Sequence, residues 1–293
     1  YYLANGGEIP VMGFTPDGEY PVINGEKGII NVTFSHANVQ TGDVRLLSIH
    51  GGTAPNVVPA HACAKLACPR ELAQRLANLS APQVRFTATD YGLFVEAEGE
   101  SAHGSTPELG KNAIGRLLLA LDTLPLSGEV ASALHFLAAT LGMETDGASA
   151  GIALHDAVLG VINGDEHRLS LKINYRYPVT KGYADCAPIL NGKFASAGFT
   201  LDSEVHKAKL YVPADSPLVS TLLRVYREQT GLEGQPKSIG GGTYAKALPS
   251  IVAFGPIFPG EEVREHKPDE YISVDSLMRN AQIIAAAMYE MAK

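Results

Sequence analysis

The chain has 293 residues, which corresponds to about two domains and is long enough to bury a core without disulfide or metal staples. Hydrophobic residues make up 45% and charged residues 18%, a composition typical of globular proteins rather than disordered ones. Asp and Glu outnumber Lys and Arg by 31 to 23, and the resulting net charge of −8 disfavours a nucleic-acid partner.

Two further absences shape the expectations. No apolar run approaches the ~18 residues that span a bilayer, and no basic start precedes an apolar stretch. The sequence therefore predicts no membrane partner and no signal peptide.

The cysteines are odd in number and form no CxxC pair, which favours reduced thiols and a cytoplasmic location. They are Cys63, Cys68 and Cys186.

In chain order, the first ~25 residues are rich in Gly and Pro and are predicted to form loop and short strand. From Gly28 onward, short strand-like runs alternate with amphipathic helices. The predicted strands are 28–34, 44–49, 57–62, 84–89, 93–97, 168–175, 199–205 and 251–254. The predicted helices are one opened by Pro69, one capped by Thr106 and ended by Pro125, and 128–141, 181–197, 216–230 and 273–291.

The order strand, helix, strand, strand occurs before His103 and again, more weakly, over 168–205. This repetition predicts a duplicated α+β unit. The strand and helix alternation beyond residue 210 is typical of a layered α/β domain. The predicted organisation is therefore an α/β domain made of residues 1–27 and 211–293, with 28–210 as an inserted domain.

Two loops carry carboxylates or histidine in open surroundings. The segment 13–21 places Asp17 and Glu19 between prolines, which suits a divalent cation, although Pro-Asp-Gly is also a common turn sequence. His103 lies among small residues just before a predicted helix, where imidazole could donate to an oxyanion. An exposed loop histidine is the alternative.

Three other features are candidates for binding a substrate or a metal ion. The glycines at 240–242 allow close approach of a ligand to the backbone, and Lys246 nearby could bind a carboxylate. A flexible hinge is the alternative interpretation of these glycines. His266 lies beside Glu and Asp, as a metal ligand or as part of a solvated charge cluster. Arg176 lies near the end of a predicted strand, either in a surface ion pair or binding a substrate carboxylate.

The motifs occur in an order that is similar to that of a known protein family. They are GFTPDGEYP with GEKG, APNVVP, SAHGSTPELGKNA, NYRYP, GGGTYA and EHKPDEYI, spread from residue 13 to residue 271. In this order they are similar to the co-catalytic metallopeptidase family of bacterial dipeptidase V, carnosinase, aminoacylase and succinyl-diaminopimelate desuccinylase. The forms GFTPD, GGGTY and EHKPDE look most like the dipeptidase V branch.

The resemblance implies a zinc-peptidase catalytic domain with two zinc ions, or Mn or Co in their place, and an inserted lid of two ferredoxin-like halves. It also implies two metal ligands, a lid histidine that stabilises the oxyanion, and a set of residues that bind substrate. Carried over to this sequence, the metal ligands are Asp17 and His266, and the lid histidine is His103. The residues that bind substrate are Asn56, Arg176, Gly242 and Thr243.

The function implied is metal-dependent hydrolysis of dipeptides, with a small peptide as partner and a monomer, or else a dimer, as the assembly. The alternatives are an amidohydrolase that deacylates or desuccinylates N-acyl amino acids, and a non-catalytic binding module. The family's remaining ligands and general base precede the Pro-Asp motif, whereas the residues before Asp17 contain one acid, Glu8, and no histidine. The chain thus resembles a family member without its first third, and is expected to be inactive alone.

Overall fold

A computed structural model describes residues 5–141, 157–265 and 269–293. The chain divides into two compact units. The central unit contains the described residues of 29–177 and 181–207, and the terminal unit contains those of 1–28, 178–180 and 208–293. Among the described residues, no helix combines the length and apolar character that crossing a membrane requires.

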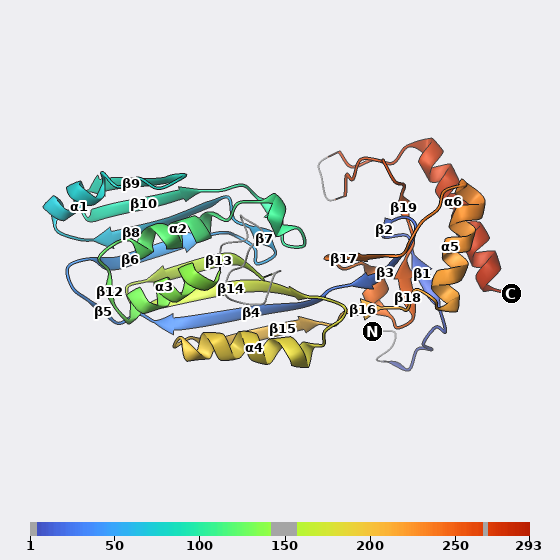
Figure 1. The fold of residues 1–293 in the computed structure, drawn as a ribbon, viewed down its shortest axis with the longest axis horizontal. Helices are drawn as coiled ribbons and strands as arrows, with labels where there is room; N and C mark the ends of the chain where they lie inside the picture. Colours follow the sequence, from blue (N-terminus) through green and yellow to red (C-terminus); the bar gives the residue numbers. More distant parts are fainter. Residues whose placement is uncertain (1–4, 142–156, 266–268) are drawn as a thin grey trace. The chain divides into compact units, whose positions relative to one another are not determined.

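The central unit is built on one eight-stranded sheet in the order β15-β4-β14-β13-β6-β8-β10-β9 (Figure 1). In chain order these strands are β4 (Gly28–Ala37), β6 (Arg45–Gly51), β8 (His61–Ala67), β9 (Val84–Thr89), β10 (Gly92–Glu98), β13 (Ala157–Asp165), β14 (Arg168–Tyr177) and β15 (Thr200–Lys207). The helices are α1 (Arg70–Leu76), α2 (Ala113–Asp122), α3 (Glu129–Thr140) and α4 (Tyr183–Ser196). Short strands β5 (Gln40–Thr41) and β12 (Ser127–Gly128) pair with each other, as do β7 (Val57–Val58) and β11 (Ala102–His103).

The sheet consists of two halves with the same arrangement. From the centre outward, one half runs β6, β8, β10, β9, and the other runs β13, β14, β4, β15. In each half a helix, α1 or α4, connects the second strand to the outermost one. The halves meet where β13 pairs with β6 in antiparallel register. The duplication predicted from the sequence is therefore present, with β4 joining the second half from the start of the chain.

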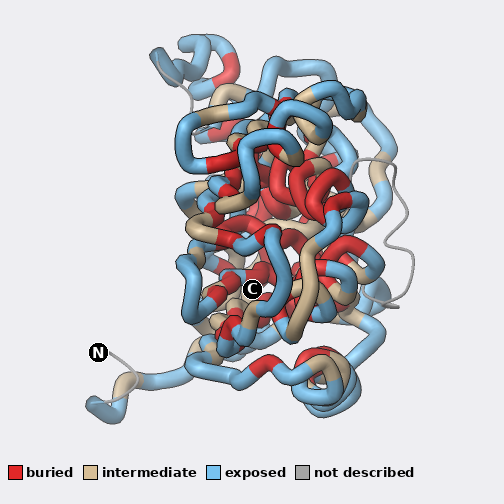
Figure 2. Tube along the Cα trace, turned by 90° about the vertical axis from the view of Figure 1, so that its left-hand side faces the viewer, coloured by how far each residue is buried: buried red, intermediate tan, exposed pale blue. Residues whose placement is uncertain are grey.

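The helices and one face of this sheet enclose the larger core. On β4, Ile30, Val32 and Phe34 belong to that core, because alternate residues of a strand point to the same face. The Phe34 ring stacks on Phe194 of α4 with 4.3 Å between the ring centroids. Figure 1 shows α2 and α3 lying together over the sheet, and Figure 2 shows the buried stretches of the chain in red.

Two local predictions for the central unit were wrong, and one strand was missed. The helix expected at Thr106 begins instead at Ala113, because Asn112 Oδ1 accepts hydrogen bonds from the next turn's backbone at 2.9 and 3.2 Å. Thr106 precedes only a short 3-10 turn, Pro107–Leu109. The strand expected over 57–62 is divided into β7 and β8. Strand β13 was not predicted.

The terminal unit has a smaller sheet of order β1-β18-β3-β16, with β17 paired to β3. Its elements are β1 (Gly13–Thr15), β2 (Gly18–Glu19), β3 (Ile23–Glu26), β16 (Leu210–Tyr211), α5 (Pro217–Thr230), β17 (Lys237–Ile239), the 3-10 helix η4 (Tyr244–Ala247), β18 (Ile251–Ala253), β19 (Pro256–Ile257) and α6 (Val274–Met291). Its core centres on Tyr20, whose ring contacts Phe254 and Phe258 with centroids 5.0 and 4.8 Å away. Gly255, at φ +74°, lets Tyr20 approach, because a Cβ there would lie 2.4 Å from the ring.

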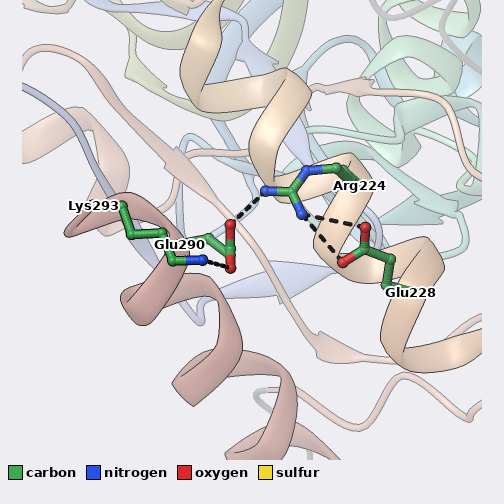
Figure 3. A network of polar contacts seen from close by, with 4 residues as sticks. All are labelled: Arg224, Glu228, Glu290 and Lys293. Atoms are coloured by element: carbon green, nitrogen blue, oxygen red, sulfur yellow. Dashed lines mark hydrogen bonds and ion pairs between the residues drawn. The ribbon is translucent and has the colours of Figure 1, made fainter.

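The two long helices of this unit begin and end as predicted. Ser216 caps α5 by accepting a hydrogen bond from Val219 N at 3.3 Å, and Gly231 ends it in a left-handed conformation. An ion-pair network joins α5 to α6 (Figure 3). In it Arg224 donates to Glu290 at 2.8 Å, and Lys293 donates to the same carboxylate at 2.7 Å.

Candidate functional site

In the terminal unit, Asp17 follows β1 in a tight turn. Its backbone N–H donates to the Thr15 carbonyl at 3.0 Å. Its side-chain Oδ2 accepts a hydrogen bond from the backbone N–H of Tyr244 at 2.6 Å. The carboxylate is thus oriented by an amide that lies directly after the glycine-rich segment, and it stays partly exposed.

The glycine-rich segment 240–242 follows β17, which runs parallel to β3. Thr243 then caps the 3-10 helix η4, its Oγ1 accepting a hydrogen bond from Ala245 N at 3.1 Å. A Cβ at Gly242 would lie 3.4 Å from Lys246 Nζ, an ordinary van der Waals contact with the end of a flexible side chain. Packing at Gly242 therefore does not by itself require a glycine.

Sequence reasoning missed one prominent residue here, Glu26 at the end of β3. Its side chain is fully buried, and its carboxylate accepts hydrogen bonds from the Thr243 N–H at 2.9 Å and from the Thr243 hydroxyl. Lys246 Nζ lies 3.9 Å from Glu26 Oε2 and also donates to the Lys27 carbonyl at 2.5 Å. The signal that could have indicated Glu26 is an acid at the end of an otherwise uncharged strand-like segment.

In the central unit, Asn56 and His103 lie on paired segments. Val57 of β7 is opposite His103 of β11, and Gly104 N–H donates to the Asn56 carbonyl at 2.7 Å. His103 Nδ1 accepts a hydrogen bond from Ser105 N–H at 3.2 Å and lies 2.6 Å from the Ser105 hydroxyl, which can donate to the same nitrogen. In the neutral ring this bond places the proton on Nε2, which makes Nε2 the donor.

Arg176 lies on β14 and is only 4% exposed. Its Nε donates to Asn174 Oδ1 at 2.8 Å, and Asn174 Nδ2 donates in turn to Asn31 Oδ1 at 2.8 Å. Because Asn174 precedes Arg176 by two residues, both side chains belong to the same face of the strand. The Nε hydrogen bond restricts the orientation of the guanidinium plane.

Gly104 connects this pair to the His103 segment. A Cβ at Gly104 would lie 2.9 Å from the Asn56 carbonyl oxygen and 3.2 Å from Asn174 Oδ1. The absence of a side chain at Gly104 therefore lets the His103 segment pack directly against Asn174. The structure brings Asn56, His103 and Arg176 into one neighbourhood of the central unit, through contacts that the spacing of these residues in the sequence did not indicate.

The remaining candidates are not joined in this way. Asp17, Gly242 and Thr243 lie together in the terminal unit, whereas His266 lies outside the described residues. Within the ranges that the structure describes, no three His, Cys, Asp or Glu side chains are grouped so that they could hold a metal ion. The described geometry thus supplies Asp17 as a candidate ligand but does not by itself define a metal centre.

Comparison with known proteins identifies the class. Residues 48–290 match the peptidase family M20/M25/M40, and the chain belongs to this family, which is generally metal-dependent. It is 34% identical to a Beta-Ala-Xaa dipeptidase of Lactobacillus delbrueckii subsp. lactis, over 100% of this chain and 65% of that protein. It is also 34% identical to a putative dipeptidase of Bacillus subtilis, over 98% of this chain and 65% of the relative.

A solved structure shows the same fold. The aminoacylhistidine dipeptidase of Vibrio alginolyticus aligns with a TM-score of 0.58 at 16% identity, over 94% of this chain and 63% of that chain. This likeness agrees with the α/β peptidase fold predicted from the sequence. The chain spans about 65% of the length of the Lactobacillus and Bacillus relatives.

Proposed function

We propose that the protein containing this chain is a zinc metallodipeptidase. The observation that carries the proposal is the buried Arg176, held by Asn174 beside the segment of Asn56 and His103. Family membership and the two relatives named as dipeptidases support it. In this proposal residues 1–27 and 211–293 are the catalytic domain, and 28–210 are a lid that carries the groups recognising substrate.

Arg176 binds the C-terminal carboxylate of the substrate in the proposed complex. A guanidinium has the planar geometry to bind both carboxylate oxygens, and the Nε bond to Asn174 restricts the orientation of that plane. A fixed carboxylate site sets the distance to the scissile bond, which restricts substrates to short peptides. Asn56 contributes a second polar contact from the adjoining segment.

His103 stabilises the negative charge that develops on the scissile carbonyl oxygen. The Ser105 amide on Nδ1 favours the ring form with a proton on Nε2, the form that donates to an oxyanion. Removing one such donor typically lowers turnover ~10²–10³-fold. His103 therefore acts on the reaction without binding a metal ion.

Asp17 and His266 would each hold one of two zinc ions, with Mn or Co as alternatives. When bound, such ions activate the attacking water and polarise the substrate carbonyl. The Tyr244 amide orients the Asp17 carboxylate for this role, and Gly242 and Thr243 form the loop that meets the substrate. A cytoplasmic location and a monomeric state remain predictions; the three cysteines, all free, agree with the former.

The proposal is tested by substrate choice. The full-length protein, loaded with zinc, is given a dipeptide, the matching N-acetyl amino acid and an N-succinyl amino acid at equal concentration. We expect the dipeptide to have the largest kcat/KM. A preference for either N-acyl substrate would assign the protein to the amidohydrolases, and no hydrolysis of any of the three would indicate a binding module.

A further inference from the structure

We propose that Glu26 is a positioning residue that anchors the loop 240–243 and thereby fixes the amide that orients Asp17. It touches neither substrate nor metal in this assignment and acts through Thr243 and Tyr244. The inference deepens the proposed function, because the importance of an oriented Asp17 rests on its role as a metal ligand.

The burial of the Glu26 carboxylate supports this role. Glu26 is 0% exposed, and a buried carboxylate is strongly unfavourable unless it is paired or hydrogen-bonded. The partners described for its oxygens are the Thr243 amide at 2.9 Å, the Thr243 hydroxyl, and Lys246 Nζ at 3.9 Å. All come from the loop and the turn of helix that follows it, so the loop supplies the groups that compensate the buried carboxylate.

The order of the amides along the loop links Glu26 to Asp17. Thr243 N–H donates to Glu26, and the next amide, that of Tyr244, donates to Asp17 at 2.6 Å. Because each peptide unit is planar, fixing the Thr243 amide and hydroxyl restricts the direction of the amide that follows. Two carboxylates from different parts of the terminal unit thus hold consecutive residues of one loop.

The composition of the loop makes such an anchor necessary for a single conformation. Three successive glycines give the backbone more conformational freedom than any other residue would, and this freedom has to be removed if the loop is to present one conformation. Strand β17 fixes the start of the loop, since Ile239 is paired in register with Glu26. The Glu26 side chain fixes the far end at Thr243.

The test is hydrogen exchange at the Thr243 and Tyr244 amides in the full-length protein, comparing wild type with Glu26→Gln. The matched control is Glu228→Gln in the same unit, whose carboxylate is half exposed and pairs with Arg224 at 3.2 Å. We expect Glu26→Gln to raise exchange at both amides at least about tenfold, since hydrogen bonds to a charged acceptor are lost. Strands β1 and β18 should change little, and the control should leave the loop unchanged.

Two results would overturn the inference. Unchanged exchange at both amides would mean that Glu26 does not order the loop. An equal increase across the whole terminal unit would mean that Glu26 stabilises the fold in general.

A second pair of variants covers the case in which Glu26→Gln does not fold. Thr243→Val removes the hydroxyl that donates to Glu26, whereas Thr243→Ser keeps it. We expect faster exchange at Tyr244 in the valine variant and near-normal exchange in the serine variant. Equal exchange in the two would contradict the inference. Since exchange needs neither substrate nor metal, a protein with an ordered loop and no dipeptide hydrolysis would refute the proposed function alone.

Discussion

Asn174→Ala is expected to weaken the proposed binding of a substrate carboxylate, because Asn174 acts through Arg176. The variant removes the acceptor of the Arg176 Nε hydrogen bond, which measures 2.8 Å and lies in a buried environment. A hydrogen bond to a charged group contributes about 1.5–3 kcal/mol. Asn31 also loses a partner, but it is only half-buried and water can replace the lost amide. We therefore expect the free energy of unfolding to fall by about 2 kcal/mol.

The functional effect is measured with a double-mutant cycle of Asn174→Ala and Arg176→Ala in the full-length protein. The measured quantity is the ratio of kcat/KM for a dipeptide to that for its C-terminal amide. Arg176→Ala should lower this ratio at least about tenfold, which corresponds to ~1.4 kcal/mol. Asn174→Ala should lower it by less, and the double variant should match Arg176→Ala alone.

Additive effects in this cycle would refute the reasoning, since they would mean that Asn174 acts independently of Arg176. Arg176→Lys supplies the control for charge. It keeps the positive charge but cannot present a planar fork, so we expect it to restore only part of the ratio. If Arg176→Ala lowers kcat/KM equally for the dipeptide and the amide, Arg176 has a structural role and does not bind the carboxylate.

Four further predictions follow from single contacts. His103→Ala should lower turnover ~10²–10³-fold with metal content unchanged by mass spectrometry, and a loss of metal would make His103 a ligand. Gly104→Ala should lower the free energy of unfolding by about 1–3 kcal/mol in urea, because its Cβ would lie 2.9 Å from a carbonyl oxygen. The hydrogen bond from Lys293 lowers the pKa of the Glu290 carboxyl. The stabilisation that Glu290 provides is therefore present above its unfolded pKa of ~4.3 and is lost as pH falls through its folded pKa. In urea melts, the free energy of unfolding of Glu290→Gln should differ from that of wild type at pH ~7, and the two should converge near pH ~2. Burial raises the pKa of the Cys63 thiol, so its alkylation at neutral pH should be slower than that of a model thiol.

The predicted fold follows the sequence where periodicity and capping signals agree. The helices α5 and α6 show both, with serine before the first turn and apolar residues at helical spacing, and both were placed correctly. Thr106 shows where such signals compete. Its Thr-Pro pair is a good helix start, but Asn112 makes the actual cap, because its side chain reaches two backbone amides of the next turn.

Strand β13 shows a limit of the sequence pattern. It contains Gly160 and Gly164, and glycine inside a strand normally weakens it. Here Gly160 is required by packing, since a Cβ would lie 2.3 Å from the Pro55 carbonyl oxygen. A contact between segments so far apart in the chain leaves no local pattern. The half of the sheet formed by β13, β14, β4 and β15 was recognised only weakly for the same reason. Its strand β4 lies far upstream in the chain of its partner β14.

The candidate site could be predicted only as separate motifs. The spacing of Asn56, His103 and Arg176 gave no reason to place them together, and only the family resemblance did so. Glu26 was overlooked because its partners are on a loop more than 200 residues away in the chain, the separation to Thr243 being 217. Buried polar contacts of this kind depend on tertiary pairing, which hydrophobic periodicity does not encode.

The central claim, that this chain belongs to a metal-dependent dipeptidase, is tested most directly by removing and restoring the metal. Hydrolysis of one dipeptide by the full-length protein is measured before chelation, after chelation and dialysis, and after zinc is added back. The account predicts that hydrolysis is lost on chelation and returns with zinc. Hydrolysis that persists in metal-free protein, or a zinc-loaded protein that cleaves no dipeptide, would contradict it.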